Sequence, residues 1–174
     1  MWRVVPRLIM NYFQTLGLSA AFDIDLTALE SAYFKAQRES HPDRKPPAER
    51  AAALQRSADI NHAYNTLKNP LSRAQYLLHL QGIAIGTEAD SVKPSQAVLL
   101  EVLEWREEAE NPQELSRLDH MLQNEYDNAM KTISEASNVN AWDVMAQEVL
   151  RLGYIIKVHD EVRHKLLRQK KITP

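Results

Sequence analysis

The 174-residue sequence contains no cysteine. This absence excludes disulfide bonds, thiol catalysis and metal sites with cysteine ligands, and it fits a reducing compartment. Long apolar runs are missing as well, because none approaches the roughly 20 residues that a membrane-spanning helix needs. We therefore expect a cytoplasmic protein with no segment in a membrane.

Glycine is scarce, with four residues in the whole chain, and no stretch alternates apolar and polar side chains for long. The apolar residues recur instead at helical spacing. The sequence therefore predicts an all-α protein.

Neither sign of charge is in large excess, and the net charge of the chain is −2. The charge is nevertheless uneven. Residues 1–80 hold ten Lys/Arg and seven Asp/Glu, a net of +3, whereas residues 81–174 hold eleven and sixteen, a net of −5. This asymmetry predicts two modules with different partners. The lack of a strongly basic face argues against a nucleic-acid partner.

The first nine residues, MWRVVPRLI, contain two arginines and no acidic residue, and they are too short for a signal peptide. We expect residues 1–9 to be a non-structural extension, or the result of a start codon assigned upstream of a natural beginning at Met10. An organelle-targeting remnant is the alternative.

Residues 10–81 are predicted to form the first module, which is built on a helical hairpin. A short helix is expected over residues 11–16. The second helix starts near Asp25, where Thr27 and Glu30 have the spacing of a capping box.

The second helix must end by His41, because the residue before a proline avoids the α region, and the third starts after Pro47. The predicted apolar stripes are Leu26, Leu29, Tyr33 and Ala36 on the second helix, and Ala53, Ser57, Ile60, Tyr64 and Leu67 on the third. Facing stripes and a short connection predict an antiparallel pair with the loop at a solvent-exposed tip. A fourth helix is expected over residues 71–80.

Residues 82–94 hold glycine and proline and are expected to be a linker, and residues 95–174 are expected to be a three-helix bundle. Its first helix covers residues 95–110. The second starts at Asn111, an N-cap followed by a proline, and Asn140 opens the last. The predicted buried stripes are Leu115, Leu118, Leu122, Ala129 and Ile133 on the second helix, and Trp142, Met145, Val149, Leu152 and Ile156 on the last.

His41 and Asp43 allow two interpretations when only the residues are considered. In an enzyme they would be a base and its orienting carboxylate, but a tip loop offers neither a nucleophile nor a substrate pocket. Otherwise the histidine lies in a turn in which Asp43 caps a local amide. The tripeptide alone favours the turn.

Two motifs together resemble the J-domain, the module of DnaJ-type co-chaperones, over roughly residues 11–80. One is His41-Pro42-Asp43 between the two antiparallel helices, and the other is Ile60-Asn61-His62-Ala63-Tyr64-Asn65-Thr66-Leu67 in the third helix. J-domains dock on a DnaK-type chaperone and stimulate its ATP hydrolysis. The resemblance implies a chaperone-binding site composed of His41, Pro42 and Asp43, with Lys35, Arg38, Arg44 and Lys45 as electrostatic support.

Four further segments resemble one branch of the J-domain proteins, the HscB family of iron–sulfur cluster assembly. They are Asn11-Tyr12-Phe13, Arg73-Ala74-Gln75-Tyr76-Leu77-Leu78, Leu99-Leu100-Glu101 and Arg106-Glu107-Glu108. The resemblance implies a co-chaperone that delivers an IscU-type scaffold protein to an HscA-type chaperone and stimulates its ATPase. No cysteine-bearing zinc module precedes the J-like part, which points to the bacterial type. One departure is Ser40, where an aromatic residue commonly precedes the histidine.

Three other functions stay open at this point. The first is a general J-domain co-chaperone with a different client, and the second is an enzyme built around His41 and Asp43. The third is a helical nucleic-acid binder, against which the acidic second half argues.

The first helix of the bundle carries more leucine than its core-facing side needs. Helical phase places Val98, Val102, Trp105 and Ala109 toward the core, and it places Leu99, Leu100 and Leu103 on a different side, beside Glu104 and Glu107. Exposing each leucine forgoes roughly 1.5–3 kcal/mol of burial energy, so either a partner binds there or another segment of the chain covers them.

Tyr154 lies nearly opposite the apolar stripe of its own helix, and we expect an exposed ring. The alternative is an isolated surface tyrosine of no special role. The resemblance implies that the scaffold-binding site consists of Leu99, Leu100, Leu103, Glu104, Glu107 and Tyr154.

The six histidines form no pair or carboxylate cluster with the spacing of a zinc site. His159 and His164 are five residues apart and do not share a helical face. We expect no metal, no cofactor and no catalytic residue, and we expect a monomer.

Overall fold

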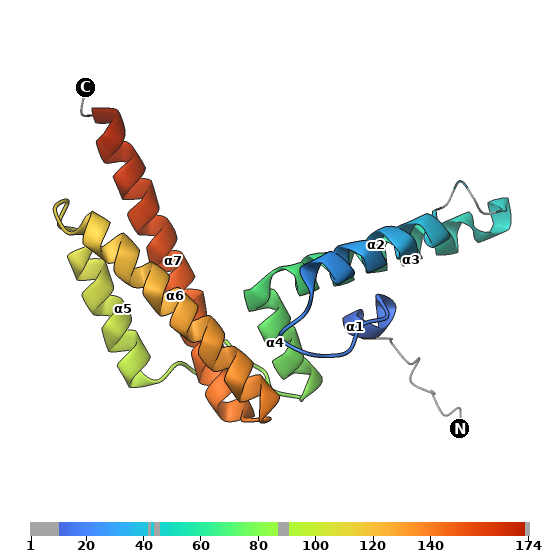
Figure 1. The fold of residues 1–174 in the computed structure, drawn as a ribbon, viewed down its shortest axis with the longest axis horizontal. Coiled ribbons are helices and arrows are strands. Elements are labelled where there is room, and N and C mark those ends of the chain that lie inside the picture. Colours follow the sequence, from blue (N-terminus) through green and yellow to red (C-terminus); the bar gives the residue numbers. More distant parts are fainter. Residues whose placement is uncertain (1–10, 42, 44–45, 87–90, 173–174) are drawn as a thin grey trace. The chain divides into compact units, whose positions relative to one another are not determined.

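The computed structural model describes residues 11–41, 43, 46–86 and 91–172. The expected extension over residues 1–9 lies outside this part of the chain, as do Pro42, Arg44 and Lys45. The elements, in chain order, are α1 (Tyr12–Thr15), α2 (Leu26–Ser40), the short 3-10 helix η2 (Pro47–Glu49), α3 (Arg50–Lys68), α4 (Pro70–Leu80), α5 (Gln96–Glu108), α6 (Leu115–Asn138) and α7 (Trp142–Ile172) (Figure 1).

The all-α prediction is confirmed, since the described residues show helices and a single isolated bridge between Ile85 and Val92. The chain divides into two compact units, with the boundary between Tyr76 and Leu77. In the described part of the chain no helix has the length and apolar character that crossing a membrane requires.

In the first unit α2 and α3 form the expected antiparallel hairpin, joined at one end by the His41 loop (Figure 1). Asp25 is the N-cap of α2, and its Oδ1 accepts hydrogen bonds from the backbone N–H groups of Thr27 and Ala28 at 2.8 and 3.3 Å. The capping-box prediction is therefore wrong, because a carboxylate two residues before Thr27 already satisfies the first free amides of the helix.

The hairpin is held by buried apolar side chains and by a polar cluster between the helices. Leu29 is buried on α2, and Ala53, Ile60, Ala63 and Leu67 are buried on α3. Leu26 was predicted to belong to the buried stripe but is 53% exposed. It is the first residue of α2, and burial on this helix begins one turn later.

The polar cluster fixes the register of the two helices. Gln37 Nε2 donates to the carbonyl of Ser57 at 3.1 Å and to Asn61 Oδ1 at 2.6 Å. The Tyr33 hydroxyl donates to the same Asn61 oxygen at 2.9 Å, and its ring stacks on Tyr64 with centroids 4.2 Å apart. These contacts align the second half of α2 with the middle of α3.

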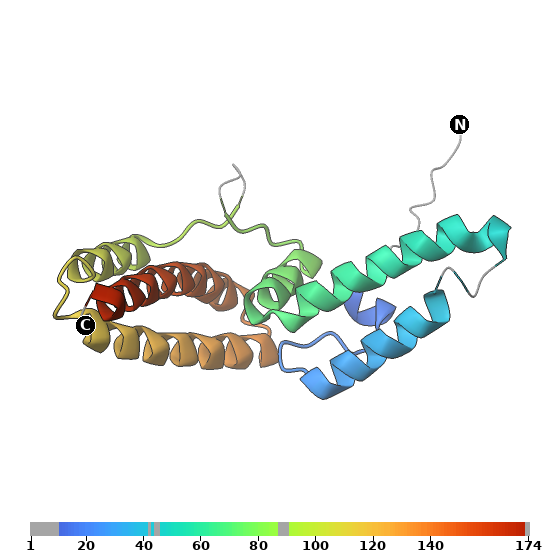
Figure 2. The same ribbon diagram turned by 90° about the horizontal axis from the view of Figure 1, so that it is seen from above.

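In the second unit α5, α6 and α7 lie side by side as the expected three-helix bundle (Figures 1 and 2). The stripe predicted for α6 is buried throughout. On α7 the prediction is wrong for two residues, since Trp142 and Ile156 are half-buried while Ile155 is fully buried. The bundle contact on this long helix thus shifts by one residue relative to a stripe read from the sequence.

Two helix starts in the bundle differ from the prediction. α6 begins at Leu115, because Asn111 closes a separate turn in which its Oδ1 accepts from the Gln113 N–H at 3.1 Å. Asn140 does not open α7. It has a left-handed backbone (φ 56°) and ends α6, where its N–H donates to the Ser137 carbonyl at 3.2 Å. Asparagine tolerates this conformation, which suits the position after a helix.

Candidate functional site

The tip of the hairpin presents His41 and Asp43 to solvent. Their side chains are 56% and 88% exposed. The backbone N–H of Asp43 donates to His41 Nδ1 at 3.3 Å, and the Asp43 carboxylate lies 3.8 Å from the same nitrogen. Because Nδ1 accepts this bond, a neutral imidazole carries its proton on Nε2. The arrangement is a compact turn. It presents the His41 Nε2–H donor and the Asp43 carboxylate to an approaching partner.

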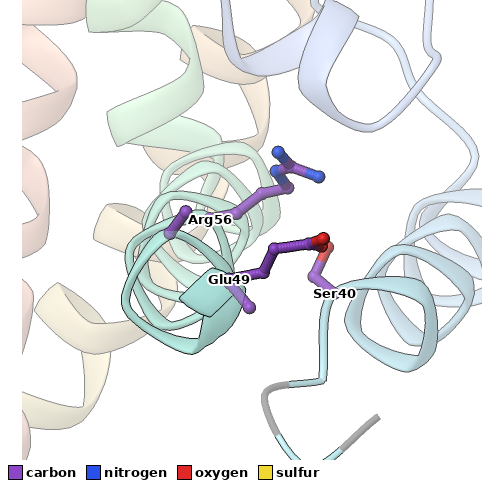
Figure 3. A pocket seen from close by; sticks show the side chains of 5 residues that line it. Ser40, Glu49 and Arg56 are labelled. Atoms are coloured by element: carbon purple, nitrogen blue, oxygen red, sulfur yellow. The ribbon is translucent and has the colours of Figure 1, made fainter. Parts of the chain in front are cut away.

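A shallow pocket of about 140 Å³ lies beside this tip (Figure 3). It is lined by Ser40, Glu49, Ala52, Ala53 and Arg56. Ser40 is buried, with 5% exposure, and the Glu49 side chain extends into the pocket from the other side. The pocket thus adjoins Ser40, the residue directly before the tip. It marks unfilled volume between α2 and α3.

The two described cations of the predicted chaperone site lie on the outer side of α2. Lys35 and Arg38 are exposed, and at 100° per residue Arg38 lies about half a turn from the buried Leu29. The side of α2 that faces away from α3 therefore carries both cations near the tip. Arg44 and Lys45 lie outside the described residues.

The leucine face of α5, defined as Leu99, Leu100 and Leu103, is exposed as predicted. The exposed fractions of the three side chains are 42%, 53% and 56%. Val98, Val102, Trp105 and Ala109 are 8% exposed or less. Glu104 and Glu107 are exposed beside the leucines. Within the described part of the chain, therefore, no other segment buries the leucines.

Tyr154 is half-buried, so the prediction of an exposed ring is only partly correct. Two ion pairs explain its position. Arg151 of α7 bonds Glu101 of α5, and Glu161 of α7 bonds Arg106 of α5 at 3.4 Å. Residue 154 is on the same row of α7 as residues 151 and 161, between them, so it lies along the flank of α5. This register brings Tyr154 to the level of the leucine face.

A mostly buried cation that the sequence analysis missed joins all three helices of the bundle. The guanidinium of Arg151 bonds Glu101 on α5 at 2.7 and 2.8 Å, Glu125 on α6 at 2.5 Å and Glu148 on α7 at 3.2 Å. It also lies 5.6 Å from the ring centroid of Trp105. The hydrogen bonds that Arg151 donates to Glu101 are the main reason that the pKa of Arg151 is raised above its ordinary value. Only the three-residue spacing of Glu148 and Arg151 could have signalled part of this cluster.

A histidine is also buried in the bundle. His159 is 6% exposed, and its Nε2 lies 2.8 Å from Asp119 Oδ1, whereas His164 is exposed. The two histidines therefore lie on different faces, as predicted. Within the described ranges no three histidine or carboxylate side chains are placed so that they could hold a metal ion.

An antiparallel hairpin with His41 and Asp43 exposed at its tip, followed by a separate helical bundle, defines a J-domain protein. Comparisons with known proteins agree: a family model described as the DnaJ domain matches residues 11–76, and one described as the HSCB C-terminal oligomerisation domain matches residues 94–163. The chain belongs to the HscB family of J-domain co-chaperones, which serves the HscA/IscU system of iron–sulfur cluster assembly. This family is not catalytic, so the enzyme interpretation of His41 and Asp43 is wrong.

The similarity extends over nearly the full length of several relatives. The co-chaperone protein HscB of Proteus mirabilis (strain HI4320) is 38% identical, with 89% of this chain and 95% of that protein covered. The co-chaperone protein HscB homolog of Shewanella sp. (strain ANA-3) is 34% identical over 88% and 95%. Among solved structures, chaperone HscB from Vibrio cholerae has a TM-score of 0.79 at 30% identity, covering 92% of this chain and 99% of that chain. Human co-chaperone HscB shares the fold, with a TM-score of 0.82 at 23% identity over 94% and 86%.

Proposed function

We propose that this protein is a bivalent adaptor of the cytoplasm. Its first unit docks on an HscA-type chaperone and stimulates ATP hydrolysis, and its second unit holds an IscU-type scaffold protein. The observation that carries the proposal is the exposure of two unlike surfaces on two separate units: the polar His41 and Asp43 at the tip of the hairpin, and the apolar leucine face on α5.

The chaperone end is supported by the geometry of the tip. His41 and Asp43 are bonded to each other through a backbone amide and contribute nothing to the buried core. Their side chains are therefore free to act on a partner without a change in the hairpin. The cations Lys35 and Arg38, together with Arg44 and Lys45, would attract an acidic surface and raise the rate of encounter.

The scaffold end is supported by the composition of the α5 surface. Three exposed leucines with a half-buried tyrosine beside them form an apolar centre, and Glu104 and Glu107 add a polar rim. An apolar centre inside a polar rim is the usual anatomy of a protein interface. The IscU-type scaffold would supply the cluster ligands, and this chain would supply the docking surface.

A binding experiment with purified partners tests the proposal. Immobilised full-length protein should retain the scaffold with or without ATP and should retain the HscA-type chaperone only when ATP is present. Substituting all three leucines of the leucine face by alanine should remove the scaffold and leave the chaperone. If the triple variant retained the scaffold as the unaltered chain does, the scaffold site would lie elsewhere. If the unaltered chain retained no scaffold, the result would favour a general J-domain protein with a different client.

We expect the adaptor to act as a monomer, because each unit buries its own core. The family model that matches residues 94–163 is described as an oligomerisation domain, so the measured mass decides between a monomer and an oligomer. Light scattering of the purified chain at several concentrations should give a mass near 19.9 kDa. A concentration-dependent doubling of that mass would contradict the expectation.

A further inference from the structure

Helix α2 turns an aromatic side chain away from α3. Phe34 is 56% exposed. At 100° per residue it lies about 140° from the buried Leu29 and about 40° from Arg38, so Phe34 and Arg38 are neighbours on the outer side of the helix. Exposing a phenylalanine loses favourable burial energy, whereas exposing a polar residue does not. The hairpin itself gains no stability from the ring on that side.

The ring of Phe34 rests on a rigid base. Its centroid lies 5.3 Å from that of Tyr33, with the two rings inclined by 56°. Tyr33 is itself fixed by its stack on Tyr64 and by its hydrogen bond to Asn61. A side chain that is already held in place loses little conformational entropy when a partner covers it. Phe34 is therefore pre-organised for binding.

The position of Phe34 connects it to the tip. Phe34 precedes His41 by seven residues, which corresponds to about 10 Å along the helix axis, and Arg38 lies between them. Phe34, Arg38 and the tip thus form one continuous strip on the hairpin. Lys35 is the next residue in the chain and is also exposed, so cations flank the ring on the side of the tip.

We propose that Phe34 is an apolar anchor of the chaperone-docking surface, and that it inserts into an apolar pocket bordered by acidic residues on the HscA-type chaperone. The cations on α2 would bring the acidic border into place, and the aromatic ring would hold the complex. This inference rests on the proposed function. It adds a contact that depends on the ring and not on charge.

Leu26 supplies a matched control on the same helix. Its side chain is 53% exposed, close to the value for Phe34. It lies eight residues before Phe34, about 12 Å farther from the tip. Replacing either residue by alanine removes exposed apolar surface from α2, but only Phe34 lies in the strip that leads to His41.

The test is a titration of chaperone ATPase stimulation under single-turnover conditions, at two salt concentrations, with melting curves for each full-length variant. We expect Phe34→Ala to raise the concentration for half-maximal stimulation about tenfold, in the range of interface anchors, with an unchanged salt dependence. Leu26→Ala should stay within about twofold of the unaltered chain. Arg38→Ala should instead reduce the salt dependence, because it removes a charge.

His41→Gln distinguishes a failure of the Phe34 anchor from a failure of the proposed function. If Phe34→Ala stimulates normally while His41→Gln is inactive, the anchor is overturned and the proposed function stands. If His41→Gln stimulates normally, the proposed function itself fails. Should Phe34→Ala lower the melting temperature, Phe34→Leu decides the matter, since an apolar anchor predicts that leucine restores most of the stimulation. Equal losses for Leu26→Ala and Phe34→Ala would also overturn the anchor.

Discussion

Single residues carry the chaperone-directed part of the proposal. His41 and Asp43 are exposed and bonded chiefly to each other, so substituting them changes a surface and leaves the core intact. Ser40, the residue before them, is buried and faces a pocket. Under the proposal, neighbouring residues thus have opposite roles, one structural and two directed at a partner.

The first prediction concerns the tip. His41→Gln or Asp43→Asn should abolish stimulation of the chaperone ATPase and leave the melting temperature unchanged, because neither side chain contacts the core. Single-turnover ATPase assays and circular dichroism melts on the same preparations check both statements. A folded His41→Gln protein with normal stimulation would mean that the tip is not the chaperone site.

The second prediction concerns the pocket beside Ser40. Ser40→Tyr should place an aromatic ring in this volume of about 140 Å³ and raise the free energy of unfolding by about 1 kcal/mol, as cavity-filling changes commonly do. Ser40→Ala is the matched control, since it removes the hydroxyl without filling the pocket. Urea denaturation measures both variants. If tyrosine lowers stability while alanine does not, the site is overpacked and not under-filled.

At the scale of the element, α5 has two unlike sides. Val98, Val102 and Trp105 hold it in the bundle, while the leucine face is exposed. Arg151 fixes the rotation of α5 against α7 through two hydrogen bonds to Glu101. The orientation of the leucine face therefore depends on a cation that is not part of it.

The third prediction compares the two sides of α5. Leu103→Ala should weaken scaffold binding by about 1–3 kcal/mol with little loss of stability, because this leucine is 56% exposed. Val102→Ala, one residue earlier and 4% exposed, should cost about 1–3 kcal/mol of stability and leave scaffold affinity unchanged. Tyr154→Ala should weaken binding and also lower the melting temperature somewhat, because the ring is half-buried. Calorimetric titrations and thermal melts on the three variants distinguish these outcomes. Large destabilisation by Leu103→Ala with full affinity would identify that leucine as core.

The fourth prediction concerns Arg151. Arg151→Met should lower the free energy of unfolding by about 2–4 kcal/mol, because three carboxylates lose their shared cation. The guanidinium side chain is 15% exposed, so solvent screens these pairs only in part. Arg117→Met, in an exposed cluster with Glu108 and Glu114, is the control and should change stability little. Equal effects in urea melts would show that burial does not strengthen the Arg151 cluster.

At the scale of the whole molecule, the proposal divides the work between two units. The boundary between them falls after Tyr76, yet α4 continues to Leu80. A fragment that keeps α4 intact must therefore end beyond this helix, as the predicted module of residues 10–81 does.

The fifth prediction tests this division. The fragment of residues 10–81 should stimulate the chaperone weakly and should show no scaffold binding by calorimetry, because the leucine face is absent. Full-length His41→Gln is the reciprocal control and should bind the scaffold normally without stimulating. Full scaffold affinity in the fragment would show that the scaffold site lies in the first unit and not on α5.

The sequence by itself determined the helices, the hairpin with its tip loop, and the sides of α5. These features depend on local periodicity, on Pro42 after His41, and on helical phase, all of which are properties of short segments. Phase alone was enough to predict that Leu103 is exposed while Val102 is buried. The resemblance of a few motifs was enough to indicate the family.

The tertiary structure decided what depends on neighbours from other helices. Asp25 caps α2 in place of Thr27, and Asn140 ends α6 instead of opening α7. Which residue caps a helix depends on the backbone amides or carbonyls that lie within its reach. Tyr154 is half-buried on a row of α7 that pairs with α5 through Arg151 and Glu161. Arg151 finds Glu101 and Glu125 only after three helices have packed, since carboxylates 50 and 26 residues away in the chain have no local signal.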